Sequence, residues 1–116
     1  MQWTNRASLS PVSRAKDLVL TWNATGYSER EWMRGSIGIG IGYVGCQAPA
    51  TAGSITIPAS MLAQLPDAKG ARPMVQLLLT PSPDNPVLYP VPLVGGGSFP
   101  GVATFSYLEA VTVDLQ

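Results

Sequence analysis

Residues 36–44 read Ser-Ile-Gly-Ile-Gly-Ile-Gly-Tyr-Val, and this stretch decides the fold class. Large apolar side chains alternate with glycine, which is the period of a β-strand and not of an α-helix. We expect one continuous strand with three glycines on one face and four large side chains on the other: Ile37, Ile39, Ile41 and Tyr43. A bare glycine face is typical of a strand that another backbone or a large side chain, such as that of Trp22, approaches closely.

Strand signals continue on both sides of this stretch. Residues 17–23 alternate so that Leu18, Leu20 and Trp22 share one face, which predicts a core strand. We expect polar residues 29–34 and the proline- and glycine-rich residues 81–97 to form loops. Further strands are expected at residues 3–5, 9–12, 53–57, 74–80 and 102–116, the last as two strands or as one strand bent around Glu109.

One short helix is expected near residues 58–65, because Pro58 suits the first turn of a helix and Pro66 closes it. Its apolar side chains would cover one end of the fold. Seven or eight short strands with a single helix predict an all-β, antiparallel β-sandwich, immunoglobulin-like in style. At 116 residues the chain has the length of one domain, so we expect a single β-sandwich domain over residues 1–116.

Charge is sparse and balanced in this sequence. Seven basic residues match seven acidic ones, and the bases are scattered along the chain. Since phosphate contacts supply most nucleic-acid affinity, we expect no nucleic-acid partner. No apolar run reaches the roughly 18 residues that span a bilayer, so no membrane span is expected. Residues 1–6 lack a signal-peptide pattern, which leaves a cytosolic protein or a piece of a longer exported chain.

The residue types that catalysis and metal binding require are scarce. The sequence has no histidine, so it offers neither a Ser–His–Asp nor a Cys–His arrangement. The lone Cys46 can neither form an internal disulfide nor complete a tetrahedral metal shell, and is expected to be a small buried side chain. We therefore expect no catalytic residues, no cofactor and no metal, and we expect that the protein is not an enzyme.

Three further patterns suggest a chemical function, but a structural interpretation is simpler for each. Residues 40–45 spell G-x-G-x-x-G, but no helix is expected behind them, as dinucleotide binding requires. Glu29 or Glu31 with Glu109 would be the carboxylate pair of a glycosidase, although solvated loop charges are the simpler interpretation. Residues 84–85, Asp-Asn, could supply oxygen ligands to calcium, but more often cap a turn.

Loop aromatics give the one ligand hypothesis. Tyr27, Trp32 and Tyr89 all fall in expected loops, where a flat ring can stack on a sugar. The alternative is that these rings are packing lids over an end of the sandwich. The three are the candidate ligand-binding residues of a carbohydrate-binding module, with a polysaccharide as its partner.

Several short motifs also occur in a recognisable order. They are Trp3-Thr4-Asn5, Arg14 ahead of Leu20-Thr21-Trp22, Cys46, and the run AGSITIPASMLAQLP at residues 52–66. This ordering resembles an uncharacterised β-sandwich region in large secreted proteins of acidobacterium-like soil bacteria. The resemblance implies export, a secreted or cell-surface location and an accessory role without catalytic residues.

The leading functional expectation is a non-catalytic extracellular structural or interaction domain that spaces, displays or assembles other parts. Sparse charge and proline-stiffened loops suit a domain that packs against neighbours. We expect protein neighbours or self-association as its partners, since edge strands can pair between chains. The carbohydrate-binding module is the alternative.

Overall fold

The computed structural model describes residues 1–82 and 87–116. Its helical elements are two 3-10 turns at Arg6–Ser8 and Ala50–Ala52 and one short α-helix, α1, at Ala59–Leu62. Its strands are β1 (Leu18–Thr21), β2 (Glu31–Ile39), β3 (Gly42–Pro49), β4 (Ser54–Ile57), β5 (Met74–Pro81), β6 (Val87–Pro92), β7 (Ser98–Ala103) and β8 (Tyr107–Thr112). All pairings between these strands are antiparallel, which confirms the all-β class.

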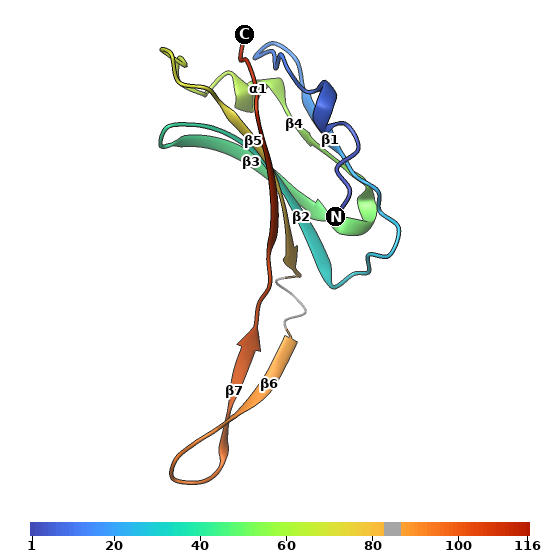
Figure 1. The fold of residues 1–116 in the computed structure, drawn as a ribbon, viewed down its shortest axis with the longest axis vertical. Coiled ribbons are helices and arrows are strands. Elements are labelled where there is room, and N and C mark those ends of the chain that lie inside the picture. The colour runs from blue at the N-terminus through green and yellow to red at the C-terminus, as the bar shows by residue number, and fades with distance from the viewer. Residues whose placement is uncertain (83–86) are drawn as a thin grey trace.

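Two sheets form a sandwich-like body. A four-stranded sheet has the order β3-β2-β5-β8, and a two-stranded sheet of β1 and β4 covers one of its faces (Figure 1). Likeness to the immunoglobulin fold is not confirmed. The smaller sheet has two strands, which is fewer than either sheet of that fold has. The core lies between the sheets, and its largest fully buried side chains are Leu20, Met33, Ile37, Ile57, Leu62, Val75, Leu77 and Val113.

Gly35 allows a close contact between the two sheets. A Cβ atom at this position would lie 2.7 Å from Leu20 Cδ1 and 2.9 Å from Ile55 Cγ2. The close approach was expected at Gly38, Gly40 and Gly42, but a Cβ atom at these positions would come no nearer than 3.2 Å to a neighbour. The closer contact is at Gly35, on the buried face of β2, and involves Leu20 instead of Trp22. Gly35 shares that face with Met33, Ile37 and Ile39, as the alternation of burial along β2 shows.

The prediction of a single strand over residues 36–44 is wrong. The chain turns back after Ile39, and Gly42 pairs with it across a two-residue loop. Gly40 occupies a positive φ of 58°, a conformation that this tight turn needs and glycine readily adopts. Ile41 is consequently fully exposed in the turn, and Tyr43 lies on the open face of the sheet. Period-two spacing continues through such a turn, so alternation alone did not reveal it.

The expected loops are also partly strands. β2 begins at Glu31, inside the predicted loop at residues 29–34, and β6 lies inside the predicted loop at residues 81–97. Residues 3–5 and 9–12 form only isolated bridges, Trp3 with Trp22 and Val12 with Leu115. The C-terminal segment divides at residues 104–106, ahead of Glu109. The suggested calcium ligands at residues 84–85 lie outside the described residues.

Other expectations are confirmed. The strands predicted at 17–23, 53–57 and 74–80 correspond to β1, β4 and β5, and β5 is central in its sheet. α1 and the turn after it cover one end of the core with Leu62 and Leu65. Asp17 Oδ1 accepts the Ala59 N–H at 2.8 Å, so a side chain from the β1 side caps this helix. Cys46, which was expected to be buried, is only half-buried, beside the sulfur of Met61 at 3.8 Å.

A long hairpin, here called the arm, extends away from the body. It consists of β6, β7 and the turn at residues 93–97, and it lies beyond one end of the two facing sheets (Figure 1). The molecule measures 59 × 31 × 22 Å with a radius of gyration of 17.4 Å. A compact chain of this length has a radius of about 13 Å, so the arm accounts for an elongated shape. None of the helices in the described part of the chain has the length and apolar character to cross a bilayer.

Candidate functional site

The three predicted ligand-binding rings lie on different parts of the molecule. Tyr27 is in the β1–β2 connection, as expected, and is half-buried against the core. Burial raises the pKa of its hydroxyl, and the negative charges of Glu109 and Glu31 raise it further.

Trp32 and Tyr89 belong to strands and not to loops, which corrects the expectation. Trp32 is the second residue of β2 and points to the face opposite the core, between Pro49 and Thr80. Tyr89 is on the arm, where its ring lies over Gly101 of β7. The structure does not bring Tyr27, Trp32 and Tyr89 together into one platform for a sugar.

The carboxylates proposed as a catalytic pair have separate partners. Glu31 accepts hydrogen bonds from the hydroxyl and the backbone N–H of Ser28 at 2.7 and 2.8 Å. These bonds hold the pKa of Glu31 below its usual value. Glu109 forms an ion pair with Arg6 at 3.5 Å.

Their positions on the sheet are also offset. Glu31 lies opposite Pro81 of β5 whereas Glu109 lies opposite Leu77 of the same strand. Four residues separate these positions along β5, about 14 Å at 3.4 Å per residue. Within residues 1–82 and 87–116, no three acidic or cysteine side chains gather in a group that could hold a metal ion.

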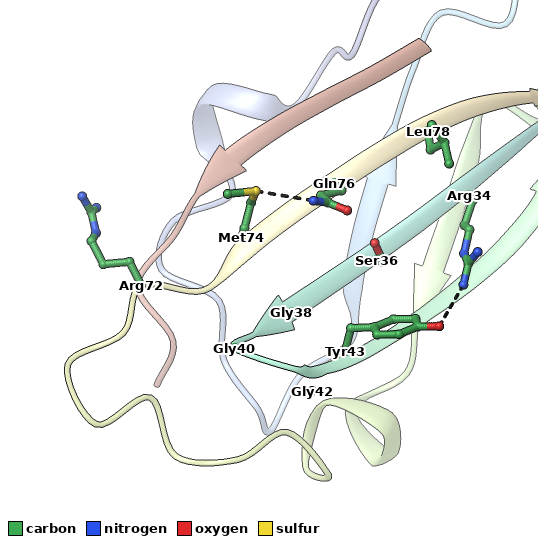
Figure 2. A pocket seen from close by; sticks show the side chains of 10 residues that line it. All are labelled: Arg34, Ser36, Gly38, Gly40, Gly42, Tyr43, Arg72, Met74, Gln76 and Leu78. Carbon is green, nitrogen blue, oxygen red and sulfur yellow. Dashed lines mark hydrogen bonds between the residues drawn. The ribbon is translucent and has the colours of Figure 1, made fainter. Parts of the chain in front are cut away.

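The uncovered face of the four-stranded sheet, here called the open face, carries a hollow of about 510 Å³. Small residues form its floor along β2, where Ser36 and Gly38 alternate with the buried isoleucines. Figure 2 shows Tyr43 along one side and Gln76 and Met74 along the other. The lining residues are Arg34, Ser36, Gly38, Gly40, Gly42, Tyr43, Arg72, Met74, Gln76 and Leu78.

The polar groups of this hollow are mainly donors. Arg34 extends toward Tyr43, with its Nη2 3.4 Å from the hydroxyl oxygen and its guanidinium carbon 5.7 Å from the ring centre (Figure 2). Arg72 stands at the other end of the hollow and points away from the floor. No carboxylate is among the lining residues. The open face therefore favours groups that accept hydrogen bonds.

The arm is apolar on both of its faces. No charged residue occurs between Asn85 and Leu108, a run of 24 residues in a chain of 116. Opposed residues of an antiparallel pair share a face, so Leu88 and Val102 lie on one side and Val91 and Phe99 on the other. Its large exposed side chains are Leu88, Tyr89, Leu93, Val94, Phe99 and Val102. Exposed apolar area of this extent is characteristic of interaction surfaces.

Prolines limit the backbone hydrogen bonds that the outer edge of the arm can form. Pro90 lies opposite Pro100, and since neither has an N–H, this must be a pair without mutual hydrogen bonds. Residues 88, 90 and 92 of β6 then direct their backbone polar groups outward. Two of these three are proline, so the outer edge of β6 presents three carbonyls and one N–H. Such an edge resists pairing with another strand.

Sequence reasoning assigned residues 81–97 to loops and so missed the arm. A usable signal was present: two proline- and valine-containing apolar segments flank Gly95-Gly96-Gly97 within one uncharged run. The triple glycine permits the positive φ values of 92° and 79° at Gly96 and Gly97. Comparison with family models, with curated proteins and with solved structures gives no match for this chain.

Proposed function

We propose that this protein is a non-catalytic interaction domain that docks onto other protein surfaces through its arm. The observation that carries the proposal is the projection of an uncharged hairpin whose two faces both expose large apolar side chains. Burying such side chains contributes about 1.5–3 kcal/mol each, which an isolated chain leaves unused. The resemblance given above adds the expectation of an extracellular assembly.

The structure of the body supports this proposal, because the body can fold without the arm and carry it. Its core closes without the arm, because the largest fully buried side chains belong to the two sheets, to α1 and to the segment after β8. The arm's strands chiefly contact each other. A rigid body with a projecting hairpin suits a spacer or assembly module, in which binding lies outside the folded core.

Photo-crosslinking in the organism that makes the chain tests this function. A benzophenone amino acid replaces Phe99 on the arm or, as a control, Val19, which is an exposed apolar residue on β1 of the body. We expect a discrete crosslinked protein product from position 99 and none from position 19. Equal crosslinking from both positions, or none from position 99, would contradict the proposal. Mass spectrometry of the product identifies the partner, whether it is this chain or another.

A further inference from the structure

We propose that the arm's occupant is a second copy of this chain: each arm lies across the open face of the other copy, in a closed two-fold dimer. This inference rests on the proposed function, in which the arm is the docking element. It adds the partner, the receiving surface and the symmetry. Two-fold dimers are the commonest homo-oligomers, and their contacts are reciprocal.

The arm fits within the length of the open face. The nine residues of β2 span about 30 Å at 3.3 Å per residue. The six residues of β6 span about 20 Å on the same spacing, and the turn at residues 93–97 extends the arm to about 25 Å. Because the arm projects beyond one end of the body, it cannot fold over its own open face (Figure 1). Two copies placed antiparallel would set each arm beside the other's body.

The open face has room for the arm's side chains. Four small residues occupy the middle of the face: Ser36 and Gly38 on β2, Gly45 opposite Ser36 on β3, and Ala110 opposite Gln76 on β8. The hollow above them is about 510 Å³. Leu88 and Val102, which share one face of the arm and are each more than half exposed, have the bulk to fill it.

The hydrogen-bonding groups of the two surfaces are complementary. The outer edge of β6 offers carbonyls at residues 88, 90 and 92, two of which belong to prolines without an N–H. The open face offers the guanidinium group of Arg34 and the amide of Gln76, with no carboxylate beside them. Another strand paired with the edge of β6 would bring acceptors as well as donors, and its acceptors would find too few N–H groups there. The side chains of Arg34 and Gln76 bring donors, which are the groups that the edge of β6 lacks.

The area reaches the lower limit for a specific dimer. An arm about 25 Å long and two strands wide has a footprint of about 250 Å² on each face. In a reciprocal dimer two arms and two open faces are covered, about 1,000 Å² in total on the same spacing. Specific interfaces bury about 1,000 Å² or more, and their centres are depleted in charged residues, as the arm is.

Crosslinking between single-cysteine chains tests the geometry. In a Cys46→Ala background, one chain carries Leu88→Cys on the arm and another carries Gln76→Cys on the open face. We expect the mixed pair to form a disulfide-linked dimer under mild oxidation. The control pair, Leu88→Cys with Val19→Cys on the opposite sheet, is expected to remain unlinked. Links between two Leu88→Cys chains without mixed links would overturn the inference in favour of arm-on-arm contact.

Sedimentation and solution scattering of the unmodified chain test whether it forms a closed dimer. We expect a mass twice the 12.2 kDa of the chain at high concentration. Since each arm lies beside the other body, the dimer should be little longer than the 59 Å monomer. Copies joined only through their arms would be about 90 Å long on the same strand spacing. That length, or masses that grow without limit as head-to-tail contacts produce, would overturn the inference.

A matched pair of variants tests the contribution of the arm. Leu88→Asp should raise the dimer dissociation constant at least about tenfold, because it places a charge in a dry contact. Val19→Asp adds the same charge on the body and should leave the constant unchanged. Circular dichroism checks that both variants are folded, and Val102→Asp replaces Leu88→Asp should that variant unfold.

The outcomes separate the inference from the proposed function. A chain that stays monomeric at all concentrations, while Phe99 crosslinks to a different protein in cells, overturns the second-copy inference and retains the docking function. A monomeric chain with no crosslink at Phe99 overturns both. A dimer with arm-to-face links and a length near 60 Å supports both.

Discussion

Gly35 is a residue at which the two sheets are in close contact. Its missing side chain is replaced by Leu20 and Ile55 of the opposite sheet, both of them buried. Because protein interiors are close-packed, these side chains can move aside only by disturbing their other contacts. A larger residue at this position of β2 should therefore strain the packing between the sheets.

Gly35→Ala should lower the free energy of unfolding by about 1–3 kcal/mol, as overpacking a closed core does. Denaturant unfolding at a concentration where the chain is monomeric measures the change. Gly95→Ala is the control, because a Cβ atom there meets nothing within 4 Å. We expect that control to stay within about 0.5 kcal/mol. Equal effects of the two substitutions would show that the sheets do not pack closely at Gly35.

At the scale of elements, the connection before β2 is fixed by side chains. Glu31, the first residue of β2, accepts two hydrogen bonds from Ser28, which ties the connection to the strand. Asn5 does the same for β1. Its side-chain amide donates to Val19 O at 2.8 Å and accepts from the Thr21 N–H at 3.0 Å, as a paired strand would. At the edge of β1, a single polar side chain thus supplies hydrogen bonds that a neighbouring strand would otherwise supply.

The Glu31 contacts should make stability depend on pH on the acid side. The pKa of Glu31 is lowered in the folded chain, so its contribution to stability is complete above its usual pKa near 4.5. That contribution is lost as the pH falls through the lower folded value. The difference in unfolding free energy between the native chain and Glu31→Gln should therefore shrink below about pH 4.5.

Urea unfolding between pH 3 and pH 6 measures this difference. Glu29→Gln is the control, because the Glu29 carboxylate makes no hydrogen bond within the described residues. A pH profile of Glu31→Gln that runs parallel to that of the native chain would show that the Ser28 contacts do not persist in solution.

At the scale of the whole molecule, the body and the arm differ in how they are stabilised. The body encloses a core between its sheets, whereas the arm exposes both faces and has contacts chiefly within itself. The radius of gyration of 17.4 Å reflects this division. A substitution in one part should accordingly have little effect on the stability of the other.

Two leucine substitutions test this independence. Leu77 is fully buried in β5, and Leu77→Ala should cost about 2–5 kcal/mol of unfolding free energy. Leu88→Ala removes the same atoms from the arm and should change the monomer's unfolding free energy by less than about 0.5 kcal/mol. Both are measured in dilute solution, where dimer contacts do not contribute. A loss above about 1 kcal/mol for Leu88→Ala would show that the arm packs against the body.

The sequence by itself determined the all-β class, the strands near residues 17–23, 53–57 and 74–80, and the short helix. Each of these depends on local alternation or on a proline that suits a helix start, which a single segment carries within itself. The candidate site was predictable only in part. Tyr27 falls in a connection as expected, but its distance from Trp32 and Tyr89 depends on which face each strand presents.

Only the tertiary structure decided the turn at Gly40, the face on which Tyr43 lies, the close approach at Gly35 and the arm. Alternation continues unchanged through a two-residue turn, so the sequence of residues 36–44 fits one strand as well as two. Prolines in β6 and β7 are compatible with strands only because their nitrogens point away from the partner strand. The turn at Gly40 and the strands of the arm both depend on which residues pair across a turn, and that register is a property of the folded chain.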